Sequence, residues 1–131
     1  MEDILYTGCY DKTIKEWDVK TGKCISNNRA HQKPIVCVST FKENKNIFLL
    51  SSSYDSYIKL WKYPERKLIQ EYKTKENNPV YSVYPDFTQK EFASGSKSTL
   101  IDLWDYEKAI VKTSFSGHTN DVNRVIVYII R

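Results

Sequence analysis

The chain has 131 residues, of which 40% are hydrophobic, 27% charged and 14% aromatic. This is the balance of a single globular domain, and it excludes a disordered chain, a collagen-like chain and a disulfide-stapled miniprotein. The 20 basic and 16 acidic residues give a formal net charge of +4 without a long run of one sign, so a nucleic-acid partner is not indicated.

The distribution of apolar residues excludes a membrane protein and a secreted protein. The longest apolar run, near residues 125–130, is far shorter than the roughly 20 residues that span a bilayer. The first ten residues carry acidic side chains and precede no long apolar stretch, unlike a secretory signal peptide. We therefore expect an intracellular protein, cytoplasmic or nuclear.

Three cysteines, Cys9, Cys24 and Cys37, are odd in number and show no C-x-x-C spacing. This pattern predicts neither a disulfide framework nor a zinc site. We expect the cysteines to be small buried hydrophobic residues, and we expect no cofactor.

Short apolar and β-branched runs alternate with clusters of Asp, Asn, Gly, Ser or Pro, a pattern typical of strands joined by tight turns. In chain order we predict three strands near 4–9, 13–18 and 23–28, then four between about 34 and 73. Four more are expected between 79 and 115, and a last one at 122–130. The sequence therefore predicts an all-β fold of 12 strands.

Three segments of the chain superimpose on one another. They end at Trp17, Trp61 and Trp104, which are 44 and 43 residues apart. A second element, Ala30-His31 before the second segment, recurs after the third as Gly117-His118. At the matching place before the third segment we align residues 77–79, which contain no histidine.

The period, the histidine, a strand of small residues, a turn Asp and a strand ending in Trp-Asp together resemble the WD-repeat family. This resemblance implies a β-propeller, here an arc of about three four-stranded antiparallel blades in an incomplete ring. The blade units would be 1–30, lacking its innermost strand, 31–75 and 76–116. The innermost strand of a further blade would lie at 118–131.

The resemblance also implies a buried chain of hydrogen bonds within each blade. In the second blade the chain would join His31, Ser51 (or Ser53), Asp55 and Trp61. The other blades supply only parts of it, namely Asp11 and Trp17 in the first, Trp104 in the third and His118 at the start of the next. Because Ser98 replaces the turn Asp of the third blade, we expect packing alone to hold that blade.

A serine, a histidine and an aspartate in one group also raise the possibility of a hydrolase. These residues occupy strand and turn positions that repeat with the architecture, whereas a catalytic serine needs an exposed elbow beside an oxyanion hole. We therefore predict a structural role for them, with no catalytic residues and no metal ligands.

The resemblance implies a non-enzymatic scaffold that binds peptides or domains of a larger complex. Tyr10 and Tyr54 directly precede the turn Asp of their blades, and Lys97 holds that place in the third blade. We take these three residues as candidates for partner binding. The alternative is that they cap the edge of the neighbouring blade. Two other functions stay open, an RNA-binding component of a complex and a truncated product without a function.

Three blades cannot close a propeller, which has typically four to eight. The remaining blades are expected to come from the rest of a longer WD-repeat protein, from a second copy or from a different polypeptide. With a second copy, a head-to-tail dimer would close a ring of six blades.

Overall fold

The computed structural model describes residues 3–75, 77–86 and 90–127. This part of the chain contains eleven strands and no helix, so it contains no helix long and apolar enough to cross a membrane. The strands form three antiparallel sheets of three, four and four strands. The predicted all-β fold with an open ring is confirmed.

Each sheet is one blade whose strands follow the chain from the innermost to the outermost. Blade 1 consists of β1 (Ile4–Gly8), β2 (Thr13–Asp18) and β3 (Cys24–Arg29). Blade 2 consists of β4 (Ile35–Glu43), β5 (Asn46–Ser53), β6 (Tyr57–Tyr63) and β7 (Lys67–Lys73). Blade 3 consists of β8 (Val80–Asp86), β9 (Glu91–Ser96), β10 (Ile101–Asp105) and β11 (Ile110–Phe115).

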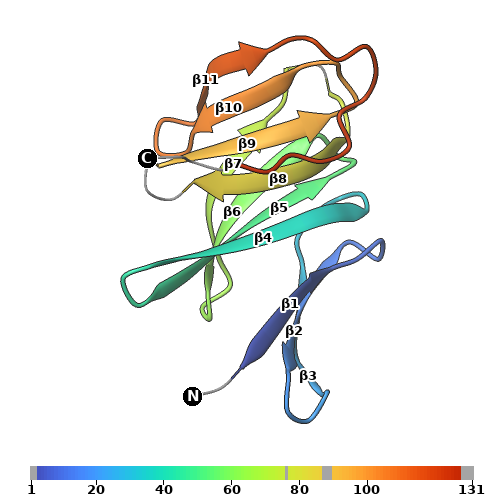
Figure 1. Ribbon diagram of the computed structural model, residues 1–131. Helices are drawn as coiled ribbons and strands as arrows, with labels where there is room; N and C mark the ends of the chain where they lie inside the picture. The colour runs from blue at the N-terminus through green and yellow to red at the C-terminus, as the bar shows by residue number, and fades with distance from the viewer. Residues whose placement is uncertain (1–2, 76, 87–89, 128–131) are drawn as a thin grey trace.

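The three blades follow one another in an arc, from the blue N-terminal sheet to the orange and red C-terminal sheet (Figure 1). Strand β4 contacts β1 of the preceding blade and β8 of the following one. Two hydrophobic clusters fill the spaces between blades. One is centred on Leu49 and Trp61, and the other on Phe92 and Trp104, whose stacked rings have centroids 5.7 Å apart. Each large side chain buried there contributes about 1.5–3 kcal/mol to folding.

A β-bulge recurs at the tryptophan of every blade. The pairing of β2 with β3, of β6 with β7 and of β10 with β11 shifts register immediately before Trp17, Trp61 and Trp104. On the opposite side of the same strands, the pairing with β1, β5 and β9 is continuous. The repeat seen in the sequence is therefore also a repeat of backbone geometry.

The prediction of a last strand at 122–130 is wrong for residues 122–127, which form no strand, and residues 128–130 lie outside the described part. The Val122 amide donates to the Ser96 carbonyl (3.0 Å) and the Val125 amide to Ser82 Oγ (3.1 Å). These bonds dock the segment on blade 3, but they are not a ladder. An apolar β-branched run becomes a strand only beside a paired neighbour, and the described chain places none there.

The docked segment nevertheless lies on blade 3 where the innermost strand of a following blade would lie. A Cβ built on Gly95 would stand 2.8 Å from Val122 Cγ1, and a Cβ on Gly8 would stand 2.5 Å from Ile35 Cγ2. Ile35 is the first residue of β4, and its amide donates to the Cys9 carbonyl (3.0 Å) as that of Val122 donates to Ser96. Residues 122–127 thus repeat, on blade 3, the contact that β4 makes on blade 1.

Candidate functional site

Blade 2 contains a continuous chain of side-chain hydrogen bonds. Nδ1 of His31 lies 2.8 Å from Asp55 Oδ2, and its Nε2 lies 2.7 Å from Ser51 Oγ. Trp61 Nε1 donates to the same Ser51 oxygen at 3.0 Å. Because a carboxylate can only accept, Nδ1 of His31 donates to Asp55, and Ser51 Oγ bridges imidazole and indole. The structure brings together all four residues expected in this blade.

The hydrogen bonds to Asp55 keep its carboxylate charged. Burial alone would raise the pKa of Asp55, but the hydrogen bonds from His31 and from the backbone amides of Tyr57 and Gln32 outweigh it. The pKa of Asp55 therefore lies below its usual value of 3.8. Ser53, the alternative to Ser51, instead bonds the Lys33 carbonyl at 3.0 Å.

The bond between indole and hydroxyl recurs in the other two blades, where the full chain does not. Trp17 Nε1 donates to Thr7 Oγ1 at 2.8 Å, and Trp104 Nε1 donates to Ser94 Oγ at 2.9 Å. Sequence analysis missed Thr7 and Ser94. Each hydroxyl residue stands ten positions before its tryptophan, a constant spacing that could have revealed both.

The turn residues of blades 1 and 3 make only local bonds. Asp11 Oδ1 accepts from the Thr13 amide at 3.1 Å, and Ser98 Oγ accepts from the Leu100 amide at 3.2 Å. His118 is exposed, and no hydrogen bond joins it to another residue in the described ranges. The structure therefore does not bring Asp11 or His118 into a buried chain.

The alignment of residues 77–79 with the histidine position needs correction. The Thr74 amide donates to the Ser56 carbonyl (3.2 Å), as the Ala30 amide donates to the Lys12 carbonyl (3.0 Å). Thr74 therefore corresponds to Ala30, and the next residue, Lys75, corresponds to His31. The loop before β8 is one residue longer than the loop before β4, which displaced the alignment.

Three tyrosines, Tyr10, Tyr54 and Tyr81, form a row of ring contacts across the three blades; we call them the tyrosine row. The hydroxyls of Tyr10 and Tyr54 are 2.9 Å apart, and their rings meet edge to face with centroids 5.8 Å apart. Tyr54 and Tyr81 also meet edge to face, at 6.1 Å. Tyr10 is 64% exposed, whereas Tyr54 and Tyr81 are half-buried. Sequence analysis missed Tyr81, because it is the second residue of an innermost strand and precedes no turn Asp.

Two members of the tyrosine row, Tyr54 and Tyr81, have raised pKa values. The pKa of Tyr54 is raised, chiefly by its hydrogen bond with Tyr10. The pKa of Tyr81 is raised by burial and by the neighbouring charge of Asp121. Lys97 matches Tyr54 in its backbone, since its amide donates to the Pro79 carbonyl (3.0 Å) as that of Tyr54 donates to Pro34 (3.1 Å). Its side chain is exposed, and among the described residues no hydrogen bond or cation–π contact joins it to the tyrosine row.

The expectation of buried cysteines is wrong for two of the three. Cys9 and Cys24 are exposed, because one follows β1 at its turn and the other begins the outer strand β3, while Cys37 is half-buried. Within the described ranges, no three His, Cys, Asp or Glu side chains gather in a way that could hold a metal ion.

Comparison with known proteins agrees with the repeat. The profile of the family described as "WD domain, G-beta repeat" matches residues 22–62. The WD repeat-containing protein pop2 of Schizosaccharomyces pombe is 31% identical over 97% of the chain, which covers 16% of that protein. Mitochondrial division protein 1 of the same yeast is 26% identical over 93% of the chain, which covers 15% of that protein.

A third relative is a kinase by name. Myosin heavy chain kinase C of Dictyostelium discoideum is 29% identical over 92% of the chain, but the match covers only 15% of that kinase. The chain thus spans about one sixth or less of the length of these relatives. The tryptophan-centred bulges, the indole bonds of all three blades and these matches identify the chain as a WD-repeat protein of the β-propeller class.

Proposed function

We propose that the chain is a non-enzymatic platform that binds protein partners inside the cell, in the cytoplasm or nucleus, as part of a larger complex. The observation that carries the proposal is the tyrosine row, which runs across all three blades and exposes 64% of Tyr10. Tyrosines combine a large apolar ring with a hydroxyl and lose little entropy on binding, which suits them to interfaces. Here the neighbouring rings and the Tyr10–Tyr54 hydrogen bond hold them in place before a partner arrives.

The burial of the polar chain in blade 2 argues against hydrolysis at that chain. His31 is 1% exposed and Ser51 is fully buried, and Ser51 already accepts from Trp61. A nucleophile must reach its substrate, so this arrangement favours a structural role.

Site-specific cross-linking tests the platform. A photoreactive phenylalanine analogue replaces Tyr10 in the cell, and the captured proteins are identified by mass spectrometry. We expect one partner to be captured, and its association with the otherwise unmodified chain to be lost in the double variant Tyr10→Ala/Tyr54→Ala. The matched control is Tyr84→Ala, which removes a partly exposed tyrosine outside the row. Equal loss in the control and the double variant, without a change in circular dichroism, would contradict the proposal.

We also propose that further blades cover the two open faces, and that a second copy can supply them. In the sheet of blade 1, β1 is an edge strand, and no described strand pairs with its inner side. Residues 122–127 dock on blade 3 but pair with no strand in the described part of the chain. If residues 122–127 of each copy paired with β1 of the other copy, the two chains would form six complete blades with twofold symmetry.

Light scattering after gel filtration tests the second copy. We expect a mass near twice 15.4 kDa, and a return to the monomer mass in Val125→Asp, which places a charge in the docked face. A wild-type monomer would assign the missing blades to a longer chain or to a different polypeptide instead.

A further inference from the structure

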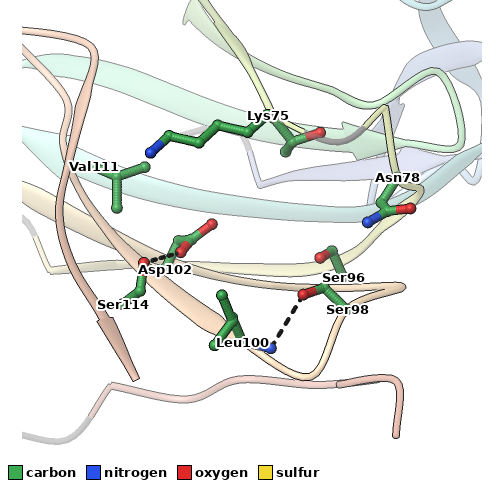
Figure 2. Close-up of a pocket in the computed structure, with 9 residues that line it drawn as sticks. Lys75, Asn78, Ser96, Ser98, Leu100, Asp102, Val111 and Ser114 are labelled. Carbon is green, nitrogen blue, oxygen red and sulfur yellow. Dashed lines mark hydrogen bonds between the residues drawn. The ribbon is translucent and has the colours of Figure 1, made fainter. Parts of the chain in front are cut away.

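A pocket of about 100 Å³ opens beside blade 3. Its walls come from the loop between β7 and β8, the turn between β9 and β10, and the outer strands β10 and β11 (Figure 2). Asp102 and Ser114 lie on one side, joined by a hydrogen bond of 2.6 Å, and Ser98 lies at the turn. Leu100 and Val111 add apolar surface. We call this the blade 3 pocket.

The corresponding place in blade 2 is filled by the protein's own side chains. Counting from the tryptophans, Asp102 corresponds to Lys59, and their cross-strand partners are Ser114 and Glu71. Ser98 likewise corresponds to Asp55, and Lys75 to His31. Three changed residues have thus removed the imidazole, the turn carboxylate and the lysine that occupy blade 2.

In blade 2 the side chain of Lys59 occupies the corresponding site. Lys59 Nζ donates to the Ala30 carbonyl at 2.8 Å and lies 3.5 Å from a Glu71 carboxylate oxygen, with only 12% of the side chain exposed. An ammonium is therefore accommodated between a loop carbonyl and an outer-strand acid. In blade 3 the acid, Asp102, stands at the position of the lysine itself, while Ser114 stands at the position of Glu71 and Thr74 at that of Ala30. In residues 3–75, 77–86 and 90–127, no cation lies within ion-pair distance of Asp102.

We propose that the blade 3 pocket binds the cationic side chain of a protein partner, a lysine or an arginine. The cation lies beside the Asp102 carboxylate, where Ser98 and Ser114 offer hydroxyl oxygens, and its aliphatic stem packs on Leu100 and Val111. This inference rests on the proposed platform function and adds the chemistry of one partner residue.

The protein's own Lys75 competes with the partner's cation for the blade 3 pocket. Its side chain runs along the wall opposite Ser98, with the ammonium directed toward Val111 (Figure 2). Its charge disfavours a second cation, but the side chain is exposed and can swing away. Removing this charge is therefore expected to strengthen binding, whereas removing Asp102 is expected to abolish it.

The test is a titration of the ¹⁵N-labelled full chain with Nα-acetyl-lysine N-methylamide at low salt, followed by NMR. We expect saturable shifts centred on the amides of Leu100, Asp102 and Ser114. The same compound acetylated at Nε has no charge and should leave them unchanged. Asp102→Asn should abolish the shifts, and Lys75→Met should tighten binding by about fivefold, the size of a partly exposed charge interaction.

Two further samples make the outcome decisive. Glu107→Gln removes an exposed acid of the same blade that pairs with Lys90, and it should not change the titration. Tyr10→Ala/Tyr54→Ala should bind the lysine compound normally, so failure of the tyrosine row and failure of the pocket are distinguishable. Absence of shifts at the three amides, equal shifts with the neutral compound, or shifts with sodium acetate instead would each overturn the proposal.

Discussion

The hydroxyl groups of Tyr10 and Tyr54 lie 2.9 Å apart although 44 residues separate them in sequence. The bond joins equivalent turns of blades 1 and 2. Removing it therefore tests how much it contributes to holding the two blades together. Tyr54→Phe removes the bond and keeps the ring contact. Because the pair is exposed, we expect a loss of about 0.5–1 kcal/mol in the free energy of unfolding by urea. Tyr10→Phe should give the same loss, and the double variant should add nothing further.

The polar chain predicts a large difference between two equivalent turn residues. Asp55→Ala removes the acceptor for His31 and for two backbone amides, and it should cost about 2–4 kcal/mol of unfolding free energy. Ser98→Ala removes one acceptor of a backbone amide and should cost about 0.5–1 kcal/mol. Urea denaturation of both variants measures the difference. Equal costs would mean that the chain around His31 contributes nothing specific.

Acid should weaken the wild type through Asp55. Since the pKa of Asp55 is lower in the folded protein than its usual 3.8, the unfolded state binds the proton more readily. The contribution of Asp55 is complete above about pH 5 and is lost as the pH falls through the lower, folded value. Asp55→Asn lacks this titration. The stability gap between wild type and Asp55→Asn should therefore narrow as the pH falls below about 5, as measured by urea unfolding.

Alkali should weaken the protein through Tyr72. Burial, followed by the neighbouring Tyr106 and Asp105, raises the pKa of Tyr72 above its usual 10.0, and its hydroxyl donates to the Tyr106 carbonyl at 2.6 Å. A raised pKa means that stability is complete below about pH 10 and falls as the pH rises further. Tyr72→Phe should lose about 1 kcal/mol at neutral pH but show a shallower decline above pH 10. A decline as steep as that of the wild type would assign the effect to other tyrosines.

Glycine should be required at the two blade contacts. Gly8→Ala would place a methyl group 2.5 Å from Ile35 Cγ2, and the overpacking should cost about 1–3 kcal/mol. Ile35→Leu removes the branch that clashes, so the double variant should recover part of the loss. Gly95→Ala should instead lift residues 122–127 from blade 3, which hydrogen exchange at the Val122 and Val125 amides would report. Unchanged exchange at these amides would show that the segment adjusts to the methyl group.

The sequence predicted the blades well, because strand patterns, turn residues and the tryptophan period are local signals that all agree. The predicted strand bounds differ by a residue or two at most places, as between 4–9 and β1 (Ile4–Gly8). The prediction for 122–127 failed because strand formation depends on a neighbour, which is not a property of the segment itself. The exposure of Cys9 and Cys24 was missed for a related reason, since burial depends on which blade covers a face.

The site was predicted where contacts lie within one blade. His31, Ser51, Asp55 and Trp61 belong to one repeat, so the resemblance to the WD-repeat family placed them in one chain. Contacts between blades leave no comparable pattern in the sequence, so the contact of Tyr81 with Tyr54 is apparent only in the structure. The correspondence of Lys75 with His31 was missed because the loop before β8 has one extra residue, which shifted the alignment to residues 77–79.

The bulge before each tryptophan also separates two parts of a blade mechanically. The strand that carries the tryptophan pairs without interruption with its inner neighbour, which bears the hydroxyl partner, and irregularly with its outer neighbour. A residue gained or lost in β3, β7 or β11 can be absorbed at the irregularity without stretching the buried indole bond. The outer rim can therefore diverge in length and sequence while the tryptophan strand and its inner neighbour stay in register, so new surfaces can evolve there without refolding the blade.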